Sequence, residues 1–194
     1  MVPLNIPNAL TMLRILAVPV VLVALLGEIP NGDLWAGIVF AAAAFTDGLD
    51  GYIARRKGDV TTFGKLMDPL ADKLLVIAAL VALVSLDRLA AWIAMVIIAR
   101  ELAVTGLRAA AMEQRVVISA SWLGKLKTAL QIGAVIALIA IDPSPIWVDV
   151  LVYAAAAVTV ISGADYFFGV RRRIEHQRRA ERELAGVTRS EAAG

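Results

Sequence analysis

The chain has 194 residues, 60% of them hydrophobic, with a mean hydropathy of +0.77 and a formal net charge of +2. Such a composition is typical of a membrane protein and, at this length, of a single domain. The absence of cysteine excludes disulfides, thiolate metal ligands and a cysteine nucleophile, and the one histidine, His176, lies in a polar segment, which excludes histidine-based catalytic triads.

Six apolar segments are long enough to cross a bilayer, which takes about 20 residues of helix. They cover residues 9–27, 34–55, 67–86, 89–112, 119–141 and 146–170. The first segment carries Arg14, lacks a small-residue cleavage site and is too long for a removable signal peptide. We therefore predict an all-α, polytopic membrane helix bundle with six transmembrane helices in residues 1–170, followed by a basic tail in residues 171–194.

Charges between the segments predict the orientation, because Lys and Arg accumulate on the cytoplasmic side of a membrane. The connections after the second and fourth segments are basic, whereas those after the first, third and fifth are neutral or acidic. Arg171, Arg172 and Arg173 follow the last segment, so both termini and the tail are predicted to be cytoplasmic. Aromatic residues of the membrane interface fall near the predicted span ends: Trp35, Trp92, Trp122 and Trp147.

The second and third segments carry four aspartates. Asp47 and Asp50 are three residues apart, and Asp68 and Asp72 are four residues apart, so each pair shares one face of a helix. Four ionised carboxylates at membrane depth would repel one another, and each such charge costs about 3 kcal/mol on insertion scales. Divalent cations remove that objection, because they bind carboxylate and phosphate oxygens and can assist a displacement at phosphorus. The spacing therefore indicates a metal site for phosphate chemistry.

The fourth segment places Glu101, Thr105 and Arg108 on one helix face. Arg108 offers a forked donor suited to phosphate oxygens, and charges inside a membrane usually serve a function, which favours phosphate binding over snorkelling to the interface. Arg100 and Glu101 are adjacent and are expected to point apart.

The fifth segment places Ser121, Lys125 and Thr128 at i, i+4 and i+7, so two hydroxyls and an ammonium share a face that could cradle a phosphate. We favour phosphate binding for Lys125. For Lys73 and Lys127, snorkelling to the cytoplasmic interface explains the charge equally well.

The aspartates belong to a longer pattern, Asp47-x2-Asp50-Gly51-x2-Ala54-Arg55-x8-Gly64-x3-Asp68-x3-Asp72. This pattern resembles the signature of the CDP-alcohol phosphatidyltransferases at every defined position. Weaker similarity in residues 5–14, 98–108 and 121–128 extends the resemblance over nearly the whole chain. These stretches are similar to family members whose acceptor is glycerol 3-phosphate.

The resemblance implies that an acceptor hydroxyl attacks the lipid-side phosphorus of CDP-diacylglycerol and that CMP leaves. It implies Mg2+ or Mn2+, as two ions, with Asp72 similar in position to the proposed general base. The implied metal ligands are Asp47, Asp50, Asp68 and Asp72. The residues that grip the cytidine diphosphate are Asp50, Gly51, Ala54, Arg55 and Gly64. The candidates for the acceptor phosphate are Arg108, Lys125, Thr105, Ser121 and Thr128.

The same resemblance implies an integral protein of a bacterial cytoplasmic membrane, with the active site facing the cytoplasm. CDP-diacylglycerol, glycerol 3-phosphate and membrane lipids are then the partners, no nucleic acid is expected, and a homodimer is left open. Cardiolipin, phosphatidylserine and phosphatidylinositol phosphate synthases share the signature and stay as alternatives. A divalent-cation transporter is a remote alternative, because it would need ligands near the midplane and a path to both faces.

Overall fold

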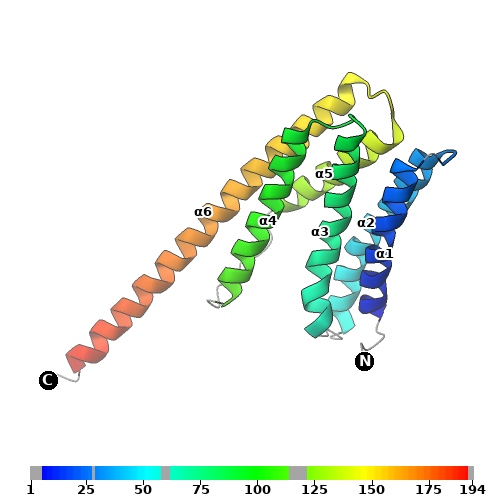
Figure 1. Ribbon diagram of the computed structural model, residues 1–194. Coiled ribbons are helices and arrows are strands. Elements are labelled where there is room, and N and C mark those ends of the chain that lie inside the picture. The colour runs from blue at the N-terminus through cyan, green and yellow to red at the C-terminus, as the bar shows by residue number, and fades with distance from the viewer. Residues whose placement is uncertain (1–5, 28, 58–61, 114–121, 192–194) are drawn as a thin grey trace.

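The computed structural model describes residues 6–27, 29–57, 62–113 and 122–191. Within its helices, the side chains of residues 6–8, 47–57, 62–70, 72, 113, 174 and 176–191 lie outside the description. Regular secondary structure in the described residues is entirely helical (Figure 1). The six helices are α1 (Ile6–Leu26), α2 (Gly32–Lys57), α3 (Thr62–Ser85), α4 (Ala91–Glu113), α5 (Trp122–Ala140) and α6 (Ile146–Glu191).

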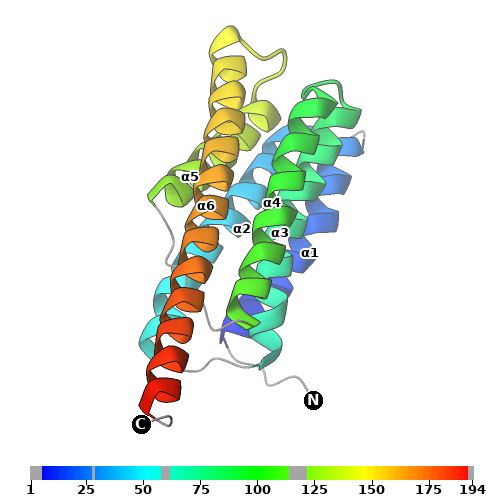
Figure 2. The same ribbon diagram turned by 90° about the vertical axis from the view of Figure 1, so that its left-hand side faces the viewer.

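The helices form a bundle in which α1 and α6 each pack along two other helices. α1 packs along both α2 and α3, which have few contacts with each other. α4 lies between α3 and α6 in Figure 1 and contacts both, and in Figure 2 it covers part of α3. α5 packs mainly on α6 and also contacts α2, which joins the first part of the chain to the last.

The bundle is closely packed inside and apolar outside, as a lipid environment requires. In α1, residues three or four apart form one buried stripe, which includes Thr11, Arg14 and Val21. Leu16 and Val23 on the opposite side are exposed, at 63% and 60%. Alanines recur at the buried helix contacts, where small side chains let the backbones approach closely: Ala17, Ala24, Ala36, Ala79, Ala94, Ala134 and Ala155.

Within the described residues, three helices are long and apolar enough to cross a membrane, over Ala9–Leu26, Trp122–Ala140 and Ile146–Arg173. Shorter apolar stretches, Gly32–Thr46 and Lys73–Ser85, adjoin the parts of α2 and α3 whose side chains are not described. The prediction of an all-helical protein is confirmed for the described residues, and each of the six helices overlaps one predicted segment, although α6 continues well beyond residue 170. The count of six spans and the cytoplasmic termini stay predictions.

The four tryptophans agree with an interfacial location. Trp35, Trp92, Trp122 and Trp147 each lie in the first turn or two of a helix, and all are at least half exposed. Aromatic rings favour the headgroup region, because one edge is apolar and the other can donate a hydrogen bond.

α6 is much longer than a bilayer requires. Its 46 residues correspond to roughly 70 Å of helix, against about 30 Å for the hydrocarbon core. The apolar part ends at Arg173, and the helix continues to Glu191 without a break at the predicted start of the tail. In Figure 1 this C-terminal part leaves the bundle at the end where α1 begins.

One arginine ties together three connections at the opposite end of the bundle. Arg88, in the turn between α3 and α4, contacts Asp33 of α2 through its Nη2 atom at 2.8 Å, and the same atom lies 3.0 Å from Asp142. Its Nη1 atom donates to the carbonyl oxygen of Ile139 at 3.3 Å. The hydrogen bond to Asp33 raises the pKa of the Arg88 guanidinium, although partial burial opposes the rise.

The Arg88 contacts should contribute measurably to stability. We expect Arg88→Ala to lower the free energy of unfolding by about 1 kcal/mol, because half-exposed ion pairs contribute up to that amount. The measurement is thermal unfolding of the purified protein in detergent. Arg171→Ala is the matched control, because the ion pair of Arg171 in the described part of the chain is with the exposed Glu175, four residues along α6. Equal unfolding midpoints for Arg88→Ala and wild type would contradict a stabilising role.

Candidate functional site

The predicted metal ligands lie on two helices joined by a short connection. Asp47 and Asp50 belong to the C-terminal part of α2, and Asp68 and Asp72 to the N-terminal part of α3. Residues 58–61 connect these parts, so the end of α2 and the start of α3 must be neighbours. In Figure 1 both lie at the end of the bundle where α1 begins. Both segments are helical, so Asp47 and Asp50 are three residues apart on one helix and Asp68 and Asp72 are four residues apart on the next, as the sequence predicts.

The side chains of these aspartates are outside the described part of the structure, as are those of Gly51, Ala54, Arg55 and Gly64. Among the side chains that are described, no three acidic or histidine residues gather as a metal site. The donor set fits the predicted ions nonetheless, because it consists only of carboxylates, the oxygen ligands that hard divalent cations prefer.

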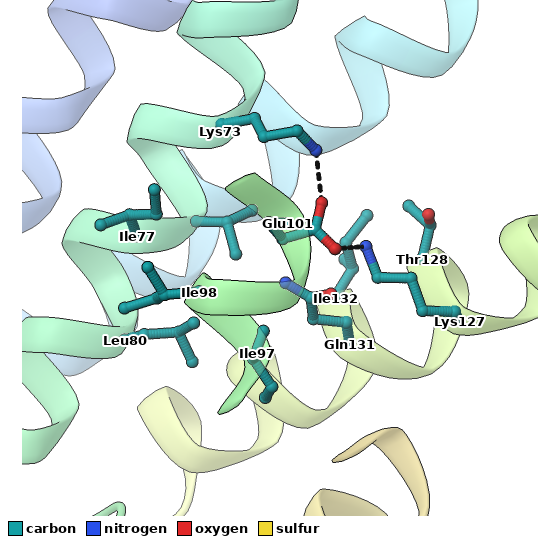
Figure 3. A pocket seen from close by; sticks show the side chains of 11 residues that line it. Lys73, Ile77, Leu80, Ile97, Ile98, Glu101, Lys127, Thr128, Gln131 and Ile132 are labelled. Atoms are coloured by element: carbon teal, nitrogen blue, oxygen red, sulfur yellow. Dashed lines mark hydrogen bonds and ion pairs between the residues drawn. The ribbon is translucent and has the colours of Figure 1, made fainter. Parts of the chain in front are cut away.

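A buried carboxylate lies at the centre of a charged cluster between α3, α4 and α5. Glu101 of α4 is 5% exposed. Lys73 of α3 donates to its Oε2 atom, and Lys127 of α5 donates to its Oε1 atom (Figure 3). Lys127 is also 5% exposed, so its ammonium does not reach the interface by snorkelling.

Arg100 extends the charged cluster to α6. Its Nη1 atom donates to Glu101 at 3.1 Å, its Nη2 atom to the hydroxyl of Ser162 at 2.6 Å, and its Nε atom to the carbonyl of Thr159 at 3.2 Å. The expectation that Arg100 and Glu101 point apart is therefore wrong. The long arginine side chain folds back far enough for its terminal guanidinium to meet the neighbouring carboxylate.

The approach of Arg100 to α6 depends on a glycine. A Cβ atom at Gly163 would lie 3.0 Å from Cγ of Arg100, closer than ordinary packing allows. The backbone of α6 is therefore open at the point where the arginine side chain crosses it.

A pocket of about 60 Å³ opens beside the cluster. One side of it is polar, with Lys73, Glu101, Lys127 and Thr128, and the other is apolar, with residues such as Ile77 (Figure 3). A buried water needs about 10 to 15 Å³ on this measure, so the pocket has room for a few waters or a small anionic group.

Charge is unevenly distributed around the pocket. Among the described residues, three cations, Lys73, Arg100 and Lys127, share the single carboxylate of Glu101. Each unpaired charge in a membrane interior is costly, so this arrangement favours an additional anion beside the lysines.

The residues predicted to bind the acceptor phosphate differ from the three cations of this cluster, and four of the five are described. Arg108 is exposed and lies over the ring of Tyr166, 5.7 Å from its centroid, and Lys125 is exposed. The hydroxyl of Thr105 donates to the carbonyl of Glu101 at 2.7 Å, and Thr128 donates to the carbonyl of Gly124 at 3.0 Å. Thr128 also lines the pocket. Ser121 falls outside the described residues.

The sequence interpretation missed the pairing of Lys73 and Lys127 with Glu101. One signal was present, since Glu101 is the only acid of the fourth segment and both flanking segments carry lysines, Lys73 in the third and Lys125 and Lys127 in the fifth. A carboxylate at that depth needs cationic partners, and these lysines were the available ones.

A larger apolar groove runs between α1 and α2. It has a volume of about 360 Å³ and is lined mainly by Leu, Val, Ile and Ala, with Arg14 and Thr46 as its polar members. Thr46 immediately precedes Asp47, so one end of the groove adjoins the predicted metal site. Thr46 bonds back to the carbonyl of Ala42, which satisfies its hydroxyl within α2.

The helical bundle and the carboxylate signature on α2 and α3 are the features expected of a membrane-embedded transferase of phosphate-containing groups. The model of the CDP-alcohol phosphatidyltransferase family matches residues 4–161, and the chain belongs to this family. It is an integral membrane protein, and the family generally depends on divalent metal ions.

Curated relatives align with this chain over most of their own length. A CDP-diacylglycerol–glycerol-3-phosphate 3-phosphatidyltransferase of Bacillus subtilis is 42% identical, with 84% of this chain and 93% of the relative covered. A probable phosphatidylglycerophosphate synthase of Mycobacterium tuberculosis is 44% identical, with 84% and 79% covered. A CDP-diacylglycerol–glycerol-3-phosphate 3-phosphatidyltransferase of Rickettsia bellii is 37% identical, with 84% and 93% covered.

Loss of the central carboxylate should destabilise the bundle strongly. We expect Glu101→Gln to lower the free energy of unfolding by about 3 to 5 kcal/mol, because it leaves buried cations without their counter-charge. Thermal unfolding in detergent measures the effect. The double variant Glu101→Gln with Lys127→Gln should cost less than the sum of the single variants, because the two side chains interact directly. A Glu101→Gln protein as stable as wild type would show that the cluster does not hold the helices together.

Proposed function

We propose that this protein transfers the phosphatidyl group of CDP-diacylglycerol to the 1-hydroxyl of sn-glycerol 3-phosphate, which yields phosphatidylglycerophosphate and CMP. The observation that carries the proposal is the complete signature from Asp47 to Asp72, placed on the adjoining ends of α2 and α3. It is supported by relatives that bear this activity in their names and align over most of both chains.

The reaction exchanges one phosphorus–oxygen bond for another. The acceptor hydroxyl oxygen forms a bond to the lipid-side phosphorus, the bond from that phosphorus to the bridging oxygen breaks, and CMP leaves with the bridging oxygen. The hydroxyl proton passes to a base, for which we assign the carboxylate of Asp72. The chain therefore has mainly to hold both substrates in line, and such positioning can supply a large part of a rate enhancement.

The four aspartates would hold the divalent ions, Mg2+ or Mn2+, as a pair: Asp47, Asp50, Asp68 and Asp72. When bound, these ions would neutralise the diphosphate and polarise the phosphorus that is attacked. Gly51, Ala54 and Gly64 give the cytidine diphosphate close access to the backbone, because their side chains are small or absent. With Asp50, Arg55 completes the proposed donor site, since a guanidinium suits phosphate oxygens.

The acceptor phosphate would meet basic and hydroxyl groups of α4 and α5. Arg108 and Lys125 are exposed cations on these helices, and we assign them to the acceptor together with Thr105, Ser121 and Thr128. We assign the groove between α1 and α2 to an acyl chain of the donor, because its lining is mainly apolar and includes Thr46, which directly precedes Asp47 in the sequence. A cytoplasmic location of the signature, in a bacterial cytoplasmic membrane, would let CMP leave into water.

The acceptor identity can be tested directly. Purified protein with CDP-diacylglycerol should release CMP with sn-glycerol 3-phosphate and yield a product of the mass of phosphatidylglycerophosphate. Serine, inositol 1-phosphate and phosphatidylglycerol are the comparison acceptors. CMP release with one of these and not with glycerol 3-phosphate would remove the proposed acceptor and keep the donor chemistry.

The metal ligands make a second test. Asp47→Asn and Asp50→Asn should abolish CMP release while leaving the unfolding midpoint near that of wild type, because each removes a charged ligand and no packing element. EDTA should have the same effect on wild type, and Mg2+ or Mn2+ should reverse it. Asp149→Asn, an exposed acid at the start of α6, is the control. Full activity in the chelator would refute the proposed role of these residues.

A further inference from the structure

We propose that Tyr166 of α6 is a positioning residue for the transfer reaction, because its ring holds the guanidinium of Arg108 ready for an anionic group of the acceptor. The inference rests on the proposed function, in which Arg108 contacts the acceptor. It adds a residue beyond the stretch that the family model matches, which ends at residue 161. Tyr166 acts through Arg108 and does not itself touch a substrate.

The ring of Tyr166 is fixed by its surroundings. The residue is 9% exposed and belongs to a small apolar cluster between α4 and α6, separate from the main core. Its neighbours in that cluster are Ala111, Val170, Val104 and Leu107. The orientation of the ring is therefore set by packing within the protein, before any substrate arrives.

Arg108 lies over the face of this ring. Its Cζ atom is 5.7 Å from the ring centroid, within the distance of about 6 Å over which an aromatic face attracts a cation. Arg108 is exposed, so the ring restrains a side chain that would otherwise sample many rotamers in water. An arginine that is ordered in advance loses less conformational entropy when it binds its ligand.

An aromatic support leaves the charge of Arg108 available to a ligand. Arg88 and Arg100, by contrast, donate to carboxylates and backbone carbonyls, so much of their donor capacity is used within the protein. A ring attracts a cation without neutralising its charge, and the forked N–H donors of the guanidinium remain for the oxygens of an anion. Tyr166 can therefore orient Arg108 and still leave it a strong anion ligand.

The pair lies toward the end of the bundle that carries the signature. α3 begins and α4 ends at that end (Figure 1). Arg108 follows Glu101 by seven residues, which places both on one face of α4, about 10 Å apart along the helix axis. Arg108 is thus two helical turns closer than Glu101 to the end where the acceptor hydroxyl must meet the donor.

The test changes the electron density of the ring in the purified full-length protein. Tyr166→Phe should keep the wild-type KM for sn-glycerol 3-phosphate, because the Tyr166 hydroxyl has no hydrogen-bond partner in the described part of the chain. Phenylalanines with one, two and three ring fluorines at the same position keep the shape of the ring and weaken its attraction for a cation stepwise. The acceptor KM should rise along the series, about two- to fivefold in total, while the KM for CDP-diacylglycerol stays constant.

A double-mutant cycle provides an independent measurement. Tyr166→Leu should raise the acceptor KM about two- to fivefold alone and have no further effect in the Arg108→Ala protein, because the ring acts through Arg108. Tyr153→Leu is the matched control and should leave both KM values unchanged. Tyr153 is an exposed tyrosine near the start of the same helix, where its ring lies 6.1 Å from that of Trp92.

An acceptor KM that stays constant along the fluorine series would overturn the inference, and so would an equal effect of Tyr166→Leu with and without Arg108. A raised acceptor KM for Tyr166→Phe would assign the effect to the hydroxyl and overturn it as well. Should Tyr166→Leu fail to fold, the fluorine series decides alone, because its members keep the packing of the ring.

The inference and the proposed function fail in different ways. If Arg108→Ala keeps the wild-type acceptor KM, the positioning role is refuted and the proposed transfer stands. If wild type itself does not use glycerol 3-phosphate, the proposed function fails and the inference fails with it.

Discussion

The burial of a single carboxylate among three cations is the constraint on which the rest of the bundle depends. Lipid tails are as apolar as leucine, so the hydrophobic effect does not press helices together within a bilayer, and close packing and polar contacts must hold them. Glu101 connects α4 to α3 and α5, and Arg100 carries the connection to α6. The small residues at the helix contacts, such as Gly163, follow from this need for close approach.

The contacts divide the bundle into two groups of three helices. α1 holds α2 and α3 together, and α6 holds α4 and α5. Both ionic clusters join the two groups, one through Lys73 and Glu101 inside the bundle, the other through Arg88 with Asp33 and Asp142 at one end. The pocket lies at the first of these junctions, so the same charges that join the groups also shape a site between them.

The sequence predicted the number and type of helices well, because an apolar run of about 20 residues has few other solutions in lipid. It predicted 89–112 for the fourth span, and α4 covers Ala91–Glu113. The continuation of α6 to Glu191 was not foreseen, because a polar helix outside the membrane lacks the apolar run that marks the others. The positions of the signature on α2 and α3 followed from the same patterns.

The site was predicted less completely, because the rotation of a helix about its own axis depends on its neighbours. Spacing alone could not decide which of Lys125 and Lys127 faces inward, and the partner that decides it, Glu101, lies on another helix. Long side chains make contacts harder to predict from helix positions. Arg100 and Glu101 leave the helix in different directions, yet the guanidinium of Arg100 donates to the carboxylate of Glu101. The signature residues keep the roles assigned from the family pattern, as proposals.

The separation of the paired charges along the chain has a consequence for how the protein is made. Lys73 precedes its partner Glu101 by 28 residues, and Lys127 follows Glu101 by 26. At a synthesis rate of about 5 to 20 residues per second, Lys73 waits roughly one to six seconds before its counter-charge is synthesised. During that interval the nascent third helix carries a charge that favours the membrane interface or the water of the insertion channel. Full insertion of α3 is therefore tied to the arrival of α4, and the order of translation becomes part of the assembly pathway.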